Sequence, residues 1–361
     1  MQKMHSLHSP CLLASLTQLQ HADNEVFSLP SQEQNQLCWS TSFQSASQLA
    51  EALGRLGKSF QALQLTTGSM HGHFAVVQLS GLSIISISTN QLLMLNGERG
   101  NDCSCFCLEI SGTHQDHRVH GIPIAPCSLH GFKPDLSESH FHLTAGSTTY
   151  FAITSSSRFG AFLERCGHEQ LRDTLENSNS LLLSDRMHRE IKQRFSWHLK
   201  HPLKKAEQRS LHTGNIYTLL MQALAQQDRE DFQPFQISPR QHLVNELVRW
   251  GFQNSSNPIS LDQLSHILFS SRRTLIQGCK ENFNMGPMEL LKVIRLEQVN
   301  WVLRSEERRL SLQLNTVGEI AEFFGFHSRG HFSAAYRKHF QEMPRQTFSN
   351  AIDYPPVGNR N

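Results

Sequence analysis

Two short stretches carry polar side chains whose types and spacing suit hydrogen bonding to nucleic-acid bases. In the first, SRRTLIQGCKENF at residues 271–283, Leu275 belongs to the apolar stripe of a predicted helix, whereas Arg273 and Gln277 point away from it. Arginine can bind guanine O6 and N7 in a bidentate way, and glutamine can bind adenine likewise. These two side chains are therefore the first candidates for contacts with base edges.

The second stretch, SRGHFSAAYRKHF at residues 328–340, repeats this layout with different side chains. Phe332, Tyr336 and Phe340 recur every fourth residue and form the apolar stripe of a helix. The other face and its flanks offer, in chain order, Arg329, Gly330, Ser333, Ala334 and Arg337. Because glycine and alanine donate nothing from a side chain, we hypothesise that the first stretch reads more of the base sequence and the second supplies more phosphate contacts.

Each stretch begins with a serine that is predicted to cap its helix, Ser271 in the first and Ser328 in the second. A phosphate contact is a second role that these positions allow. For His331 a phosphate contact and packing at the helix edge remain open. The whole predicted DNA-binding set is Ser271, Arg272, Arg273, Gln277, Ser328, Arg329, His331, Ser333 and Arg337. The alternative is that these are solvated groups on ordinary amphipathic helices, but the recurrence of a Ser-Arg start favours a functional role.

The two stretches belong to a longer internal repeat. Six residues are matched 57 positions later by an identical or similar residue: Ser271, Arg272, Leu275, Lys280, Phe283 and Pro287. Each copy consists of a short helix, a turn of three or four residues and a longer helix, which is the layout of a helix-turn-helix. The predicted helix 287–305 between the copies is roughly 28 Å long. It could hold two recognition helices about one DNA turn apart, on the order of 34 Å.

With these residues in place, the segment 236–350 resembles the paired helix-turn-helix domain of the AraC/XylS family of bacterial transcription regulators. The resemblance rests on SRRTLIQGCKENFNMGPMELLKVIRLEQVNWVL and TVGEIAEFFGFHSRGHFSAAYRKHFQEMP, and it covers about a third of the chain. Within the family, the sequence of these stretches is most similar to that of the ethanolamine-utilisation regulators. Three features depart from the family pattern: Phe269 and Ser270 in the first turn, Cys279 at a usual aromatic position, and the long connection EERRLSLQLN.

The resemblance implies a sequence-specific DNA-binding regulator, with activation as the commoner mode. It also implies a β-rich N-terminal domain that binds a small effector, helices that form a homodimer, and contact with RNA polymerase. Ethanolamine or a cobalamin would be the first effectors to try, on resemblance alone. No enzyme activity and no cofactor are expected.

The N-terminal part of the sequence is predicted to be rich in strands. Short apolar runs at 73–79, 82–88 and 91–98 are separated by Gly, Asn and Ser, and Asn96-Gly97 predicts a hairpin turn. Such spacing is typical of a sandwich or barrel, here sandwich or cupin-like. Amphipathic helical patterns follow from about residue 158. The fold class is therefore α+β, ending in an all-α domain with two helix-turn-helix motifs.

The predicted domain organisation follows these changes of pattern. We expect a β-rich effector-binding domain at 1–157, a helical linker or dimerisation segment at 158–235, the DNA-binding domain at 236–350 and a flexible tail at 351–361. The net charge of the chain is only +2, but the region 236–350 has fourteen Lys or Arg against ten Asp or Glu. A mildly basic C-terminal third agrees with a nucleic-acid partner.

Several patterns bear on compartment and on metal binding. The chain has no apolar run long enough to cross a membrane and no convincing signal peptide, so a cytoplasmic location is expected. Cys103, Cys105 and Cys107 would share one face of a strand as core thiols. Three histidine groups are either metal ligands or surface or core histidines, and no metal site is predicted: His71 with His73; His114, His117 and His120; and His140 with His142.

Two other functions stay open at this stage. One is an architectural DNA-binding protein without an effector, whose N-terminal half only dimerises. The other is a cupin-like metal enzyme domain fused to a DNA-binding domain. The sequence shows no nucleophile with a base, no phosphate loop and no paired carboxylates, which disfavours the enzyme.

Overall fold

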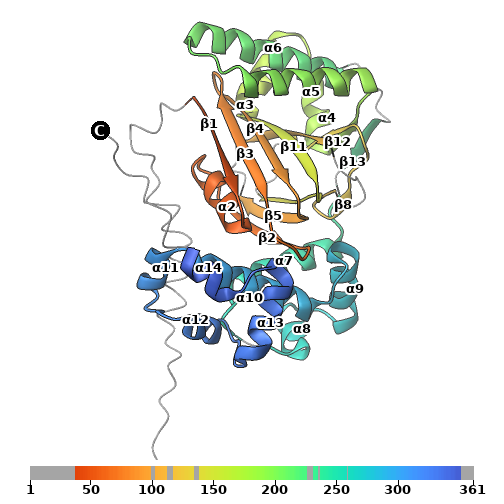
Figure 1. Ribbon diagram of the computed structural model, residues 1–361. Coiled ribbons are helices and arrows are strands. Elements are labelled where there is room, and N and C mark those ends of the chain that lie inside the picture. Colours follow the sequence, from red (N-terminus) through yellow and green to blue (C-terminus); the bar gives the residue numbers. More distant parts are fainter. Residues whose placement is uncertain are drawn as a thin grey trace, which may run out of the picture. The chain divides into compact units, whose positions relative to one another are not determined.

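The computed structural model describes residues 37–98, 102–111, 117–133, 138–225, 231–234, 236–257 and 259–350. These residues form two compact units. The β-rich unit contains the described residues up to 62 and from 70 to 237, and the helical unit contains Leu63–Ser69 together with 238–350. The predicted fold class, a β-rich part followed by an all-helical part, is confirmed (Figure 1).

Two sheets make up the β-rich unit. The larger has the strand order β1-β3-β4-β11-β6-β9-β12-β13 and the smaller the order β2-β5-β10-β7-β8. Strand β11 lies between β4 and β6 and is antiparallel to both, with Ala152 opposite Ile84 on one side and Phe106 on the other. The strands are β1 (Cys38–Phe43), β2 (Phe60–Gln64), β3 (Gly72–Gln78), β4 (Leu82–Thr89), β5 (Leu93–Glu98), β6 (Ser104–Ser111), β7 (Arg118–Val119), β8 (Ile122–Pro123), β9 (Ser128–His130), β10 (Glu138–Leu143), β11 (Ser147–Thr154), β12 (Ser178–Leu182) and β13 (Phe232–Pro234).

The hairpin turn predicted at Asn96-Gly97 is wrong. Both residues lie inside β5, where Asn96 is opposite His140 of β10. Glycine is needed here for a close approach between chain segments, since a Cβ on Gly97 would lie 2.0 Å from the carbonyl oxygen of Ser59. The same residue type that permits a tight turn therefore serves packing instead.

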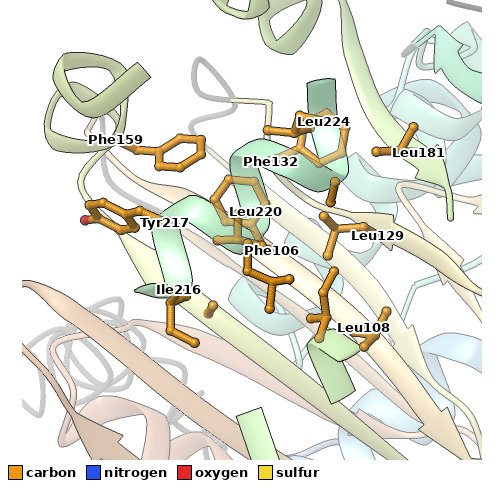
Figure 2. Close-up of a cluster of buried hydrophobic side chains, with 14 of the residues drawn as sticks. Phe106, Leu108, Leu129, Phe132, Phe159, Leu181, Ile216, Tyr217, Leu220 and Leu224 are labelled. Carbon is orange, nitrogen blue, oxygen red and sulfur yellow. The ribbon is translucent and has the colours of Figure 1, made fainter. Parts of the chain in front are cut away.

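Helices cover one face of the larger sheet. Figure 2 shows Ile216, Tyr217, Leu220 and Leu224 of α6 among side chains of β6, β9 and α3, and all four are buried in one apolar cluster. The helices of this unit are α2 (Ala46–Gly54), α3 (Ser156–Arg165), α4 (Leu171–Asn177), α5 (Asp185–Lys200) and α6 (Ala206–Ala225). Burying apolar area of this kind stabilises by about 25 cal/mol per Å², so this layer fixes the helices on the sheet.

The segment predicted as helices alone, 158–235, differs from expectation in two ways. The first helical pattern is interrupted after α3, because Gly167 adopts a left-handed φ of +75°. The chain then adds β12, which pairs with β9 and β13 in the larger sheet. Leu181 of β12 is fully buried against the sheet's apolar cluster, so burial overrides the local helical pattern.

The helical unit is organised around α10. Twelve of its 17 residues are buried, and it contacts α7, α9, α11, α12 and α14 (Figure 1). The helices are α7 (Pro239–Gln253), α8 (Leu261–Ile267), α9 (Arg272–Phe283), α10 (Pro287–Leu303), α11 (Glu306–Ser311), α12 (Val317–Phe323), α13 (Arg329–Phe340) and α14 (Pro344–Asn350). The predicted central helix is thus present, and the unusually long connection after it forms α11.

A segment from far upstream completes the helical unit. The backbone N–H of Gln64 donates to Glu297 Oε1 of α10 at 3.0 Å, and the N–H of Gly68 donates to the carbonyl of His339 at 2.8 Å. Glu297 is only 3% exposed. Burial raises the pKa of its carboxyl to about 8, against smaller lowering effects of the Gln64 hydrogen bond and the Arg304 charge. No local sequence pattern predicts this contact between residues so far apart in the chain.

A buried chain of hydrogen bonds fixes α13. Asn300 Nδ2 donates to the hydroxyl of Tyr336 at 2.7 Å, and that hydroxyl lies 2.8 Å from Thr347 Oγ1. Thr347 in turn donates to Glu342 Oε1 at 2.8 Å, and Glu342 also forms an ion pair with Arg304 at 2.9 Å. Since the hydroxyl hydrogen of Thr347 goes to Glu342, Tyr336 is the donor in its bond with Thr347.

Replacement of Tyr336 by phenylalanine should lower the free energy of unfolding of the helical unit by about 1–3 kcal/mol. The ring still fills its site, but the amide of Asn300 and the hydroxyl of Thr347 lose their buried partner. Urea denaturation followed by circular dichroism measures the loss. Lys338→Gln, on the exposed side of the same helix, should leave the midpoint unchanged, and an equal shift in both variants would contradict the role of the network.

Candidate nucleic-acid interface

The helical unit contains two helix-turn-helix motifs built with the same caps. Helices α8 and α9 form the first motif, and α12 and α13 form the second. Both short helices begin with a capping box, Ser260 with Gln263 and Thr316 with Glu319. The predicted caps of the long helices are confirmed, since Ser271 accepts from a backbone N–H of α9 and Ser328 from one of α13. Their contact with phosphate stays a prediction.

The predicted division between buried and outward faces is also present. Leu275, Cys279 and Phe283 are buried on α9, and Phe332, Tyr336 and Phe340 are buried on α13. The outward positions are exposed to solvent: Arg273 and Gln277 on α9, and Gly330, Ala334 and Arg337 on α13. Each long helix therefore presents a polar or small-residue face, as the spacing indicated.

The outward side chains of α9 differ in how strongly they are held. Gln277 Nε2 donates to Glu281 Oε1 at 2.8 Å, and Arg240 binds both oxygens of Glu281 at 2.7 and 2.9 Å. The bonds from Arg240 and Gln277 lower the pKa of the Glu281 carboxyl. Gln277 must release this carboxylate before both ends of its amide can bind a base. Within the described residues, Arg273 has no ion pair, so it is the better placed of the two for a base contact.

The two Ser-Arg starts differ in charge environment. Arg272 forms an ion pair with Asp262 of α8, with Nε 2.5 Å from Oδ1, and both side chains are more than half exposed. In the second motif the position equivalent to Asp262 is Gly318, and the guanidinium of Arg329 lies 3.7 Å from where a Cβ on Gly318 would be. No carboxylate neutralises Arg329 among the ion pairs of the described chain. This difference agrees with more phosphate contact by the second motif.

The remaining predicted side chains flank α13. His331 and Arg337 are exposed, and Ser333 is half-buried. Because His331 is exposed, its imidazole is accessible to a phosphate, and both of its predicted roles stay predictions. Contacts of all nine predicted residues with DNA stay predictions.

One exposed residue of the first motif escaped the sequence analysis as a functional candidate. Phe269, in the turn between α8 and α9, is 98% exposed and adopts a left-handed backbone with φ +47°. Its counterpart in the second turn is Gly325, with φ +77°. The sequence alone shows this difference, since the two turns align at an offset of 56 residues and have phenylalanine in one and glycine in the other.

The β-rich unit contains a cavity of about 60 Å³ between its sheets. Its walls come mainly from β4, β6, β10 and β11, and Lys58 is the one Lys, Arg, Asp or Glu among the described residues that line it. The lining residues are Leu53, Lys58, Phe60, Ile85, Ile87, Cys103, Cys105, Cys107, Val119, His120, His130, Gly131, Ser139, His140, Phe141, Phe151, Ile153 and Asn179. The predicted sharing of one face by the three cysteines is confirmed, with Cys105 Sγ 3.4 Å from Cys107 Sγ.

Burial keeps His130 and His140 of this cavity uncharged near neutral pH. It lowers the pKa of His140 to about 4 and holds that of His130 well below its usual value. His140 Nδ1 lies 3.4 Å from Asn96 Oδ1. A ligand would therefore meet neutral imidazoles, each with one donor and one acceptor nitrogen, and the single ammonium of Lys58.

The histidine groups weighed as metal ligands do not converge. His71 and His73 are exposed at the start of β3, whereas His117, His120, His140 and His142 are buried in the β-rich unit. His114 lies outside the described residues. Within the parts of the chain described here, no three His, Cys, Asp or Glu side chains are grouped to hold a metal ion. None of the described helices combines the length and apolar character of a bilayer crossing.

Comparison with known proteins finds a match in the helical unit. A family model described as "Helix-turn-helix domain" matches residues 264–350. The chain is 29% identical over 103 residues to the XylDLEGF operon transcriptional activator 2 of Pseudomonas putida, a match that covers 28% of this chain and 63% of the relative. It is 26% identical over 103 residues to the HTH-type transcriptional activator RhaS of Enterobacter sp. (strain 638), covering 28% and 34%.

Among solved structures, an AraC-type transcriptional regulator from Chromobacterium violaceum is 26% identical, with 31% of this chain and 95% of that chain covered and a TM-score of 0.28. The chain spans between 34% and 63% of the length of the two activators. Residues 264–350 form a helix-turn-helix domain.

Proposed function

We propose that this protein is a sequence-specific DNA-binding transcription regulator, an activator whose β-rich unit binds a small effector. The observation that carries the proposal is the pair of capped helix-turn-helix motifs in 264–350, each with an exposed face that bears arginine. The names of the two related activators support activation. A homodimer that acts in the cytoplasm and contacts RNA polymerase completes the proposal.

In this proposal the two motifs divide the work of binding. Arg273 contacts base edges, with Gln277 joining it once Glu281 is released. Arg329, Arg337 and His331 contact phosphates. The remaining predicted residues, Ser271, Arg272, Ser328 and Ser333, support these contacts at the helix N-termini and flanks.

Binding of the full chain to DNA tests the proposal directly. Gel shifts with a randomised duplex pool, followed by selection, should yield a preferred sequence and an affinity that falls steeply with salt, because released counterions contribute to binding. Removing one phosphate contact, as in Arg329→Ala, should reduce the salt slope by about 1. A chain that leaves every duplex unbound at low salt would refute the regulator.

The cavity of the β-rich unit is the proposed effector site. At about 60 Å³ it is several times larger than the 10–15 Å³ needed for one water, yet smaller than the ~150 Å³ that holds benzene. Ethanolamine, with few non-hydrogen atoms, suits this size, whereas a cobalamin requires the cavity to open. Membership of the ethanolamine-utilisation subgroup is part of this proposal.

A thermal-shift screen with ethanolamine and cobalamin separates the sensor from an architectural DNA-binding protein. A ligand at 100 times its dissociation constant should add about 2.7 kcal/mol to the stability. Lys58→Met should change the affinity for a charged ligand that binds in this cavity. Absence of any shift across small metabolites, with DNA binding intact, would favour the architectural alternative. The related proteins are regulators, and we propose no enzyme activity for this chain.

A further inference from the structure

The turn of the first motif contains a residue that the fold does not need. Phe269 follows α8 in a left-handed turn, where the N–H of Phe269 donates to His266 and that of Ser270 donates to Ser265. This closing pattern usually has glycine at the left-handed position. The second motif follows that rule with Gly325, whose N–H donates to Glu322, while Phe326 donates to Ala321. The two turns are thus the same structure with different residues.

Phenylalanine is unfavourable here on two counts. A left-handed backbone is strained for a residue with a Cβ, and a bulky side chain there is a genuine outlier. The ring also gains nothing from burial, because 98% of the residue's surface is exposed. Backbone strain of this kind that persists in a fold is a reason to look for a function.

The position of Phe269 indicates what the ring contacts. It precedes the N-cap Ser271 by two residues, so it stands at the N-terminal end of α9. Arg272 and Arg273 follow three and four residues after Phe269, and both are exposed. An apolar ring beside cationic side chains at this end of a recognition helix is complementary to duplex DNA. Among base-edge groups, the thymine methyl is the one that a phenyl ring can recognise.

We propose that Phe269 is a specificity-determining residue that contacts a thymine methyl group at the edge of the site read by α9. This inference rests on the proposed DNA-binding function. The contact gives the first motif an apolar element of recognition beside the hydrogen bonds of Arg273. The second motif lacks it, because Gly325 has no side chain.

A cycle of two changes tests the contact. Selection from a randomised duplex pool with the full chain gives the preferred duplex, and each thymine in it is then replaced singly by deoxyuridine, which lacks only the methyl group. For the wild-type protein, one replacement should weaken binding about fourfold, the value of one buried methyl at ~0.8 kcal/mol. For Phe269→Gly, the same replacement should have no effect.

The glycine variant also provides an internal control on folding. It relieves the left-handed strain, so its Tm should rise by roughly 2–4 °C while its discrimination is lost. Leu310→Ala removes another exposed apolar side chain, 62% exposed on α11, and should retain the wild-type response to deoxyuridine. A stabilised variant with altered recognition is not explained by damage to the fold.

Three results would overturn the inference. One is that Phe269→Gly discriminates thymine from deoxyuridine as the wild type does. Another is unchanged DNA selection combined with weaker activation in transcription reconstituted with RNA polymerase, which would make the ring a protein contact. The third is that the wild-type chain selects no duplex at all. That result would also refute the proposed DNA-binding function, whereas the first two results would leave that function unaffected.

Discussion

Replacement of Arg273 by alanine should weaken binding to the preferred duplex by about 1–3 kcal/mol, a loss of roughly five- to 150-fold, and relax the preference for guanine at one position. The reason is geometric. Arg273 is exposed on the outward face of α9, opposite the buried Leu275, and the ion pairs of the described residues leave its guanidinium available. Quantitative gel shifts on the selected duplex and on single-base variants measure both effects.

Arg337→Ala is the matched control on the second motif. Its neighbours on the outward face, Gly330 and Ala334, carry no hydrogen-bonding side chain. We therefore expect a weaker affinity that is nearly uniform across sequences and a salt slope reduced by about 1. Equal loss of base preference in Arg273→Ala and Arg337→Ala would show that the two motifs do not divide the work in this way.

Glu297→Gln should stabilise the helical unit near neutral pH and remove a pH dependence. The pKa of buried Glu297 is raised to about 8, so the folded chain holds a proton that the unfolded chain releases above its ordinary value near 4.5. Its stabilising contribution is complete below pH 4.5 and is lost as pH rises to about 8. At pH 7 the cost is roughly 3 kcal/mol. Glutamine keeps an oxygen for the Gln64 N–H without a titratable proton.

Thermal unfolding of the full chain between pH 6.5 and 8.5 is the measurement. That window avoids the protonation of buried His339, whose pKa is lowered to about 4 by burial and which destabilises the fold only in acid. Glu322→Gln, an exposed carboxylate on α12, should leave the pH profile unchanged. A Glu297→Gln profile parallel to that of the wild type would mean that Glu297 is ionised in the fold.

The elements proposed to bind DNA could be predicted because their signals are local. The stripe of Phe332, Tyr336 and Phe340 fixes the buried face of α13 through the helical period alone. The cap at Ser328 acts within one turn. Such features need only the neighbouring residues, and the repeat supplied each signal twice.

The features that escaped prediction depend on residues distant in sequence. Asn96-Gly97 has the composition of a turn, yet the pair lies in a strand. Gly97 is needed there because the backbone of Ser59, distant in sequence, lies close to it in space. The ion pair between Asp262 and Arg272 forms only once the turn between their helices has formed. The Gln277–Glu281 hydrogen bond is an exception, because residues four apart on one helix are neighbours and their contact can be predicted from the sequence. Nothing local indicates that Gln64 donates to Glu297.

The hydrogen bond from Gln64 to Glu297 joins residues 233 positions apart, and this has a consequence for how the protein folds. During synthesis, Leu63–Ser69 leaves the ribosome long before α10 and α13 exist, so the helical unit cannot be completed until both helices have emerged. Closing so long a loop costs little extra free energy, because the entropy grows only with the logarithm of its length. It does slow the search, since non-local contacts form late. We therefore expect the last step of refolding to be the docking of this short segment onto an already helical framework.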